Sequence, residues 1–415
     1  MNDLLYLVHR IPWPPNKGDK IRSYHILLHL AKHFRVHLGT FIDDPADSVY
    51  LPELEKICAS VCVRPLPPIR TKLRALTGLL TGEPLTLPWY RDAALRRWVD
   101  RTLREKNVEQ AFIFSSTMAQ YLPDASERTR VVDFVDVDSD KWTQYAATKR
   151  WPMSAVYRRE GRKLLEYERK VARHSDASLF VSPAEAASFR EFAPESATRV
   201  YAMNNGVDAT YYSPEAVDGN SPYPSGKATI VFTGAMDYWP NVDAVIWFAE
   251  AVLPRLRDRH PGIAFYIVGN RPAPQVRALA ELPGITVTGF VADIRPWIRH
   301  ATLCVAPLRI ARGVQNKVLE AMALARPIVA TPQALEGLTA QPGSEILLAP
   351  ADAALFADTV SHQLSSPHEA LGAAARARIL ADHDWERNLD RMEELLVPST
   401  PPWPGKVQAE THHGY

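Results

Sequence analysis

The sequence predicts an α/β protein made of two doubly wound domains in one chain of 415 residues. Short apolar runs alternate with longer stretches of helical periodicity almost from end to end, which indicates parallel strands joined by helices. A polar patch rich in Pro and Gly, at 213–227, separates two such series. The length exceeds that of one ordinary domain, and 46% hydrophobic with 23% charged residues is typical of a protein with a full core.

The first series predicts a domain over 1–204. It begins with a buried strand at 4–8, a loop rich in Pro and Gly, and a helix with apolar residues at helical spacing from Ile21 to Ala31. Further strands are predicted at 36–42, 111–114, 131–135 and 177–181. The longest helix is predicted at 154–174, where Val156, Leu164 and Val171 mark an apolar face.

The second series predicts a domain over 205–384, with the boundary at about 204–226. Its six predicted strands are 228–234, 263–269, 285–289, 301–307, 326–331 and 345–350. A C-terminal helix at 385–397 carries Trp385, Leu389 and Met392 on one face, and we expect it to pack back toward the first domain. The tail from 398 to 415 is rich in Pro and polar residues, and we expect it to be disordered.

Composition excludes several classes of protein. Three Cys exclude a disulfide scaffold and indicate a reducing compartment. The first residues lack the cleavage site of a signal peptide, and no apolar stretch approaches the ~18 residues that span a bilayer, so we expect a cytoplasmic protein. Neither a Walker-type phosphate loop nor G-x-G-x-x-G is present, which argues against a kinase or a nicotinamide dehydrogenase.

Charge is distributed unevenly along the chain. Residues 1–200 hold six more basic than acidic residues, although the net charge of the whole chain is +1. A basic half favours an anionic partner such as nucleic acid, a phosphorylated lipid or a membrane surface, but ordinary solvated faces explain so mild an excess equally well.

The stretch 307–332 carries the clearest chemical signal. A predicted strand ends at Pro307, a loop contains Arg312 and Gly313, and a helix runs from about 315 to 324. Gly313 lets the backbone approach a phosphate at a helix entrance, and Arg312 and Lys317 can neutralise a departing diphosphate. Glu320, three residues after Lys317, lies on the same helix face and could accept hydrogen bonds from a ribose diol. A surface Lys–Glu pair is the alternative.

RGVQNKVLEAMALARPIVAT in this stretch resembles the donor-binding segment of the family-four glycosyltransferases, which have the GT-B fold. Three other segments resemble that family in the same order: MNNGVDATYYSP at 203–214, IVFTGAMDYWPNVDAV at 230–245 and ITVTGFVADIRPWI at 285–298. Within the family, the sequence is most similar to sugar transferases associated with exosortase-linked exopolysaccharide gene clusters.

The resemblance implies a donor site. Besides Lys317 and Glu320, it implies contacts to the donor from residues in four segments: Gly18, Gly234, Asn241, Gly289, Phe290, Val291, Arg312, Gly313 and Val314. Arg312 stands where the family has its first Glu, so the usual carboxylate for the donor sugar is missing and the identity of that sugar is open. Asn241 is either an N-cap or a donor contact.

The resemblance also places the acceptor side in the first domain. Gly18 matches the family's glycine after the first strand, and Asp19 beside it either caps the helix or contacts the acceptor. Ser115 and Ser116 stand where many relatives have a His facing the reacting sugar.

An acidic cluster follows another predicted strand in that domain. Asp136, Asp138 and Asp140 would face one side if the strand persisted, and could bind a divalent cation. Asp136 or Asp138 could instead orient the acceptor or act as a base, and loop capping is a further alternative. The resemblance implies a reaction without a metal or other cofactor.

A basic amphipathic stretch at 70–90 mixes Arg70, Lys72 and Arg74 with leucines. Such a helix either lies on an anionic membrane surface or faces the protein interior.

We interpret the chain as a retaining glycosyltransferase that moves a sugar from a nucleotide-diphosphate-sugar to a saccharide or polyprenyl-linked saccharide. Arg312 and Lys317 would stabilise the diphosphate, with Asp136 and Asp138 as further candidate catalytic residues, and no nucleic acid is expected as a partner. The alternatives are a non-catalytic nucleotide-sugar-binding partner and a nucleotide-sugar epimerase. We expect a cytoplasmic protein that can lie on the inner face of the plasma membrane.

Overall fold

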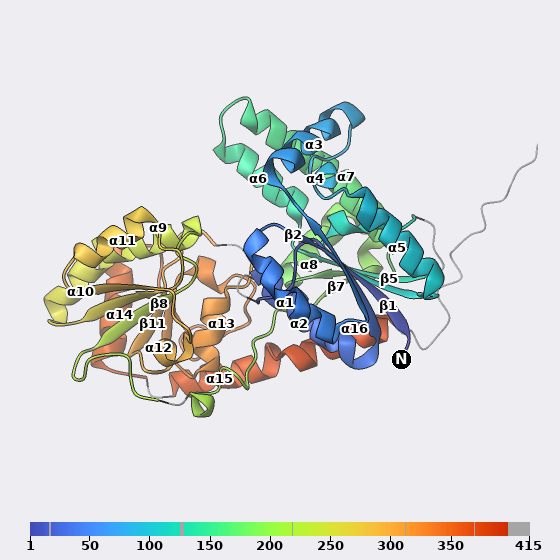
Figure 1. Cartoon of the computed structure of the whole chain (residues 1–415). Helices are drawn as coiled ribbons and strands as arrows, with labels where there is room; N and C mark the ends of the chain where they lie inside the picture. The colour runs from blue at the N-terminus through green and yellow to red at the C-terminus, as the bar shows by residue number, and fades with distance from the viewer. Residues whose placement is uncertain (16–17, 125–127, 218, 312, 369, 397–415) are drawn as a thin grey trace, which may run out of the picture.

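The structure, a computed structural model, contains two parallel sheets, each in its own α/β unit (Figure 1). It describes residues 1–15, 18–124, 128–217, 219–311, 313–368 and 370–396. The predicted fold class is therefore confirmed: two doubly wound units lie side by side. The expected disordered tail from 398 onward lies outside the described residues, as does Arg312.

The first sheet has seven parallel strands in the order β3-β2-β1-β4-β5-β6-β7. Chain order reverses between β1 and β4, so this gap is the switch point at which open α/β sheets bind ligands. The strands are β1 Asp3–Val8, β2 Arg35–Ile42, β3 Ser60–Pro65, β4 Gln110–Phe114, β5 Thr129–Val135, β6 Ala177–Phe180 and β7 Val200–Ala202.

Helices cover this sheet on both faces, and one group of them projects from its upper end as viewed in Figure 1. The projecting group contains α3, α4, α6 and α7. The helices of the unit are α1 Gly18–His33, α2 Leu51–Ile57, α3 Pro68–Thr81, α4 Thr86–Trp89, α5 Ala93–Glu105, α6 Asp138–Thr148, α7 Met153–Arg173 and α8 Pro183–Phe192.

The second sheet has six parallel strands in the order β10-β9-β8-β11-β12-β13, with its switch point between β8 and β11. Its strands are β8 Thr229–Thr233, β9 Ala264–Val268, β10 Ile285–Gly289, β11 Leu303–Ala306, β12 Ile328–Ala330 and β13 Leu347–Leu348. Its helices are α9 Trp239–Trp247, α10 Leu253–Arg259, α11 Pro274–Ala278, α12 Arg295–Arg299, α13 Asn316–Ala323, α14 Ala353–Ser365 and α15 Leu371–Asp382.

The chain crosses back to the first unit at its end. Helix α16, Trp385–Leu396, lies beside α1 and the first sheet (Figure 1). Its residues Trp385, Leu389 and Met392 belong to the same buried cluster as Leu4 and Tyr6 of β1. Burying an apolar face of this kind contributes of the order of 1.5–3 kcal/mol per large side chain, so α16 is an integral part of the N-terminal core.

All six strands predicted for the second unit are present, and each observed strand lies within its predicted range. In the first unit the prediction missed β3 and β7. β3 is half-buried along most of its length and β7 has three residues, so neither has the continuous apolar run that identified the other strands.

Candidate active site

Loops at the carboxyl ends of the two sheets meet between the units. A Cβ built on Gly18, after β1, would lie 4.0 Å from Asn316 Nδ2 at the start of α13. A Cβ built on Gly313 would lie 3.6 Å from Asp136 Oδ1, just after β5. The loops that follow β1 and β5 therefore face the entrance of α13. This is where the architecture predicts a ligand fed by both units.

On the C-terminal side, Gly234, Asn241 and Lys317 converge directly after β8. A Cβ on Gly234 would lie 2.7 Å from Asn241 Nδ2 and 3.4 Å from Lys317 Cε, and Gly234 has φ +152°. Behind it, a Cβ on Gly269 would lie 1.7 Å from the Gly234 carbonyl oxygen. The ends of β8 and β9 thus carry glycines because the two loops approach each other too closely for a side chain at Gly269.

Asn241 does not cap α9, because the N-cap is Tyr238 and Asn241 is the third residue of the helix. The N-cap interpretation was therefore wrong. The Asn241 side chain donates from Nδ2 to the Ala235 carbonyl at 2.9 Å. Its buried Oδ1 has no hydrogen-bond partner among the described residues. Asn241 therefore holds the turn after β8 and leaves one acceptor for a ligand.

Lys317 and Glu320 share one face of α13, as their spacing predicts, while Val318, Leu319 and Met322 are buried against the sheet. The Lys317 ammonium lies 5.4 Å from the centroid of the Phe232 ring and 3.4 Å from Gln315 Oε1. Burial lowers the pKa of Lys317 to about 8, against the opposing effect of Glu320. Glu320 offsets only part of the positive charge of this ammonium, so Lys317 can attract an anion.

Burial also raises the pKa of Glu320 to about 7, opposed by Lys317 and by a hydrogen bond with Tyr212. Tyr212 lies in the segment that joins the two units, and its own pKa is raised well above 10 by burial and by Glu320. The sequence interpretation missed Tyr212, although it lies in the quoted NGVD segment. Its hydroxyl fixes the orientation of the carboxylate that we predicted to hold a ribose.

The loop before α13 has the glycine geometry that a close ligand approach requires. Gly313 adopts φ +63°, and the Gln315 side chain donates to its carbonyl at 3.0 Å. Val314 packs against the core of the second unit and contacts the loop at Gly337. These residues lie where we predicted a donor contact.

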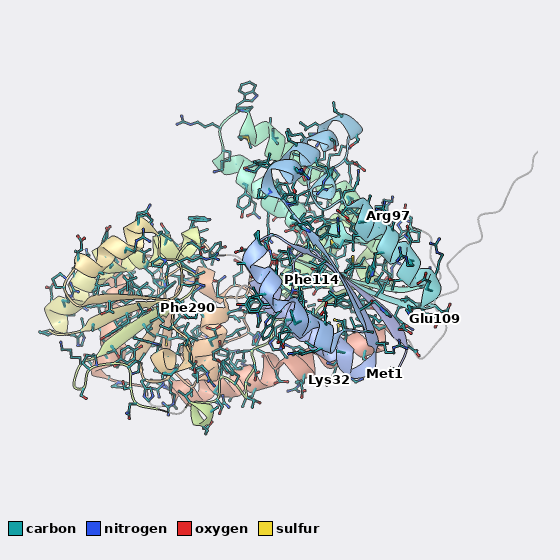
Figure 2. All side chains as sticks on the ribbon, viewed as in Figure 1. Met1, Lys32, Arg97, Glu109, Phe114 and Phe290 are labelled. Carbon is teal, nitrogen blue, oxygen red and sulfur yellow. The ribbon has the colours of Figure 1, made fainter. Side chains whose placement is uncertain are left out.

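A third predicted group, Gly289, Phe290 and Val291, lies at the end of β10, at one edge of the second sheet. Gly289 has φ +69° and a Cβ there would meet no atom within 4 Å. Phe290 is 78% exposed, while Val291 packs against the core (Figure 2). An exposed ring whose neighbour in sequence packs against the core is suited to stacking on a planar base.

On the N-terminal side, Asp19 lies in the first turn of α1 next to Gly18. It accepts a hydrogen bond from Arg10 Nη1 at 2.6 Å, and His9 Nε2 lies 3.5 Å away. Burial raises the pKa of Asp19, but His9 and Arg10 outweigh it and hold the pKa well below the usual range. His9 directly follows β1, at the switch point of the first sheet. The sequence interpretation missed this His–Asp pair, which the position of His9 after the first strand could have indicated.

The acidic cluster after β5 does not form as predicted. The strand ends at Val135, and Asp138 begins α6, so Asp136, Asp138 and Asp140 do not share a strand face. Lys141 Nζ instead contacts Asp136 at 2.6 Å and Asp138 at 3.1 Å. The described residues place no cation-binding group here, and Asp136 is the member of the cluster that reaches the loop at Gly313.

Two residues with a strained backbone lie at the carboxyl ends of β4 and β5 in the first sheet. Ser115 and Val135 adopt φ +77° and φ +69°, a region that β-branched residues in particular avoid. Ser115 pairs with the Thr117 hydroxyl at 3.0 Å, and Ser116 is buried. Ser115 thus lies at the switch point beside β1, as its position after β4 predicts.

Arg22, a residue of α1, is completely buried and holds the unit together. It donates to Asp133 from Nε at 2.7 Å and from Nη2 at 3.2 Å. It also donates to the Met203 carbonyl and to Asn205 Oδ1. Arg22 thereby joins α1, β5 and the segment that leads into the second unit.

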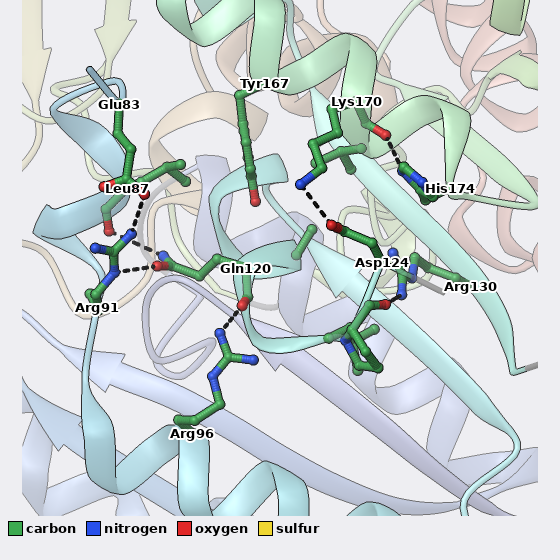
Figure 3. Close-up of a pocket in the computed structure, with 14 residues that line it drawn as sticks. Glu83, Leu87, Arg91, Arg96, Gln120, Asp124, Arg130, Tyr167, Lys170 and His174 are labelled. Atoms are coloured by element: carbon green, nitrogen blue, oxygen red, sulfur yellow. Dashed lines mark hydrogen bonds and ion pairs between the residues drawn. The ribbon is translucent and has the colours of Figure 1, made fainter. Parts of the chain in front are cut away.

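A separate pocket lies on the first unit between α5 and α7 (Figure 3). Four of its charged groups form ion pairs: Arg91 contacts Glu83, and Lys170 contacts Asp124. Two further arginines of its lining donate to backbone carbonyls, Arg96 to Gln120 and Arg130 to Pro123. None of the predicted site residues lines it.

Comparisons with known proteins agree with this geometry. Residues 227–366 match the family model described as "Glycosyl transferases group 1". Comparison with curated proteins gives no match.

Solved structures resemble the chain over nearly its whole length. The sucrose-phosphate synthase of Thermosynechococcus elongatus has a TM-score of 0.70 at 17% identity, covering 95% of this chain and 98% of that one. Anabaena Alr3699/HepE, solved in complex with UDP, has a TM-score of 0.65 at 17% identity, covering 95% and 99%. WaaG, a glycosyltransferase involved in lipopolysaccharide biosynthesis, has 0.64 at 13%, covering 95% and 100%.

The second unit thus matches the group 1 glycosyltransferase family over 227–366, and the chain as a whole has the two-unit fold of GT-B glycosyltransferases.

Proposed function

We propose that the protein transfers a sugar from a nucleotide-diphosphate-sugar to a saccharide or lipid-linked saccharide in exopolysaccharide biosynthesis, with retention at the anomeric carbon. The observation that carries the proposal is the convergence of Gly234, Asn241 and Lys317 at the end of β8, with Glu320 on the same face of α13. The binding of UDP by HepE supports a uridine donor. The resemblance to exosortase-associated transferases supports the exopolysaccharide role.

On this proposal, each group has a role. As the bond between the anomeric carbon and the β-phosphate oxygen breaks, negative charge develops on the diphosphate. Lys317, Arg312 and backbone N–H groups at Gly313 and Val314 stabilise that charge, and Glu320, held by Tyr212, accepts hydrogen bonds from the ribose. Phe290 stacks on the base. This chemistry needs no metal at the donor site, because the charged side chains supply the positive potential.

The N-terminal unit presents the acceptor side. Asp136 faces the loop at Gly313 and carries a proton acceptor to the junction, where Lys141 Nζ lies 2.6 Å from its carboxylate. Asp138 shares Lys141 from the first turn of α6. Gly18 faces Asn316 at the same junction, so the opening of α1 closes over the donor from the opposite side.

The test is a thermal-shift panel of uridine, guanosine and adenosine diphosphates and their sugar conjugates. Lys317→Ala should weaken diphosphate binding by about 1.5–3 kcal/mol, the range for hydrogen bonds to charged groups. Lys227→Ala, an exposed lysine of the same unit, is the control and should bind as the parent does. Unchanged nucleotide affinity in Lys317→Ala would refute the site.

The products separate the proposal from two other activities of the same fold. A transferase forms a new saccharide only when an acceptor is present. An epimerase consumes the donor without an acceptor and releases an altered sugar, and a binding partner binds the donor without turnover.

We further propose that the projecting helices rest on an anionic membrane surface. Leucines on α3 are exposed, Leu73 by 64% and Leu80 by 90%, and Trp151 at the α6–α7 turn is 82% exposed. Arg70 and Lys72 are exposed beside them, whereas Arg74 donates to the carbonyls of Pro88 and Trp89. No helix among the described residues is long and apolar enough to cross a bilayer.

Sedimentation with vesicles that contain anionic lipid tests this proposal. Leu73→Glu/Leu80→Glu should reduce the bound fraction, because burial of apolar area and attraction of the bases both decrease. Leu355→Glu/Leu380→Glu, at two exposed leucines of the second unit, should bind as the parent does. Equal binding by both double variants would contradict the assignment.

A further inference from the structure

Three potential metal ligands meet between α1 and α16, far from the proposed donor site. One ligand atom each from His29, His33 and Glu393 lies within 4.8 Å of the others. His29 and His33 are four residues apart on α1, so they share a helix face, and Glu393 comes from α16. His33 Nδ1 lies 3.4 Å from Glu393 Oε1.

His29 supplies an independent reason to expect a ligand. Its side chain is 6% exposed, and its Nε2 has no hydrogen-bond partner among the described residues. A buried imidazole nitrogen without a partner costs free energy, and such groups call for an explanation. A metal ion between His29, His33 and Glu393 would supply that partner.

The donor set selects a class of ion. Two imidazole nitrogens and one carboxylate oxygen suit zinc and similar divalent transition metals rather than calcium or magnesium, which prefer oxygen alone. In a tetrahedral zinc centre, with bonds of about 2.0–2.2 Å, the ligand atoms lie about 3.4 Å apart. The pair His33–Glu393 already has this spacing, and both side chains are partly exposed and free to adjust.

The surroundings favour a divalent cation. Lys32, next to His33 in the sequence, is paired with Glu386 of α16 at 2.5 Å, so its positive charge is partly offset. Lys32 lies beside α16 at the outer end of α1 (Figure 2).

We propose that His29, His33 and Glu393 bind one zinc-class divalent metal ion, with water in the fourth position. The ion fastens α16, the last helix of the chain, to α1. Because α1 begins at Gly18, facing Asn316, the ion would secure the helix that forms one wall of the junction between the units. The ion is structural and takes no part in the proposed transfer. The proposal of a metal site therefore does not depend on the proposed function.

The experiment uses the full chain, stripped of metal by a chelator and titrated with Zn²⁺ alone. All proteins carry His412→Ala/His413→Ala, because these neighbouring histidines near the C-terminus could themselves bind zinc. Zinc should bind at one equivalent and raise Tm. Cobalt(II) in its place should give the visible absorption of a tetrahedral nitrogen and oxygen site.

Two ligand variants and one control decide the assignment. His33→Ala and Glu393→Gln, at exposed positions, should each weaken zinc affinity at least about tenfold, since even outer-shell partners change it by 10–100-fold. His362→Ala, an exposed histidine on α14, should leave it unchanged. Absence of a zinc-dependent rise in Tm, or equal affinity in His33→Ala and the parent, would overturn the proposal.

Discussion

Lys317 and Glu320 are the residues whose proton equilibria bear most directly on ligand binding. Burial lowers the pKa of Lys317 to about 8 and raises that of Glu320 to about 7. A diphosphate binds the charged ammonium, so its affinity should be full below pH 8 and fall as pH rises through 8. Inorganic pyrophosphate, which has no ribose, isolates this contribution from that of Glu320.

Calorimetric titration of pyrophosphate between pH 6.5 and 9.5 measures the effect. Lys317→Arg should remove the decline, because the guanidinium stays charged over the whole interval. The same decline in Lys317→Arg would show that another group titrates there.

At this scale, spacing within one helix was predictable and partners from distant segments were not. The i, i+3 relation placed Lys317 and Glu320 together, but nothing near them in sequence indicates Tyr212. Asp136 and Asp138 were interpreted on the assumption that their strand persists. The strand instead ends before Asp136, and Lys141, in the helix α6 that follows, forms ion pairs with both carboxylates.

Among the elements, the loops after β8 and β9 approach each other closely beside the proposed donor site. Gly269→Ala would place a Cβ 1.7 Å from the Gly234 carbonyl oxygen, so the backbone of one loop must move. Gly262→Ala also occupies a positive φ, +86°, but its Cβ meets no atom within 4 Å. It should cost only the conformational strain, about 1–2 kcal/mol.

Denaturant unfolding and nucleotide binding together distinguish backbone strain at a positive φ from displacement of the loop at Gly234. Gly269→Ala should lose more stability than Gly262→Ala and should also bind nucleotide more weakly, because Gly234 is displaced. Retained nucleotide affinity in Gly269→Ala would mean that the turn after β8 does not contact the donor.

Strands buried on both faces were predictable because they are continuous apolar runs, and β8, β9, β11 and β12 of the second sheet belong to this kind. β3, by contrast, is half-buried and contains Arg64, which pairs with Asp92 of the neighbouring helix cap. An edge strand of this composition has no pattern that distinguishes it from a loop. Its place in the sheet is set by tertiary packing against β2.

For the whole molecule, the order of the two domains could be predicted from the two series of strands. The contacts between the two segments that connect the domains could not. The NGVD segment, quoted for its resemblance alone, has a physical role here. A Cβ on Gly206 would lie 2.7 Å from the Trp385 ring, and His383 Nδ1 lies 3.0 Å from the Asn205 carbonyl. The segment entering the second unit and the one leaving it are therefore packed together.

Arg22 anchors this double connection from the N-terminal side. Arg22→Met would leave the Asp133 carboxylate buried without its cation and would release Asn205 and the Met203 carbonyl. Removing one partner of a buried ion pair costs about 3–5 kcal/mol, so denaturant unfolding should show a loss of that size. Arg35→Met, at a largely exposed arginine 3.6 Å from Asp3, should cost less than about 1 kcal/mol.

A second substitution distinguishes the buried charge from the lost connection. Arg22→Met/Asp133→Asn removes the unpaired carboxylate but does not restore the hydrogen bonds to Met203 and Asn205, so it should recover only part of the stability. Full recovery would mean that Arg22 only neutralises Asp133. Losses of similar size in Arg22→Met and Arg35→Met would refute the claim that a single buried guanidinium joins α1, β5 and the interdomain segment.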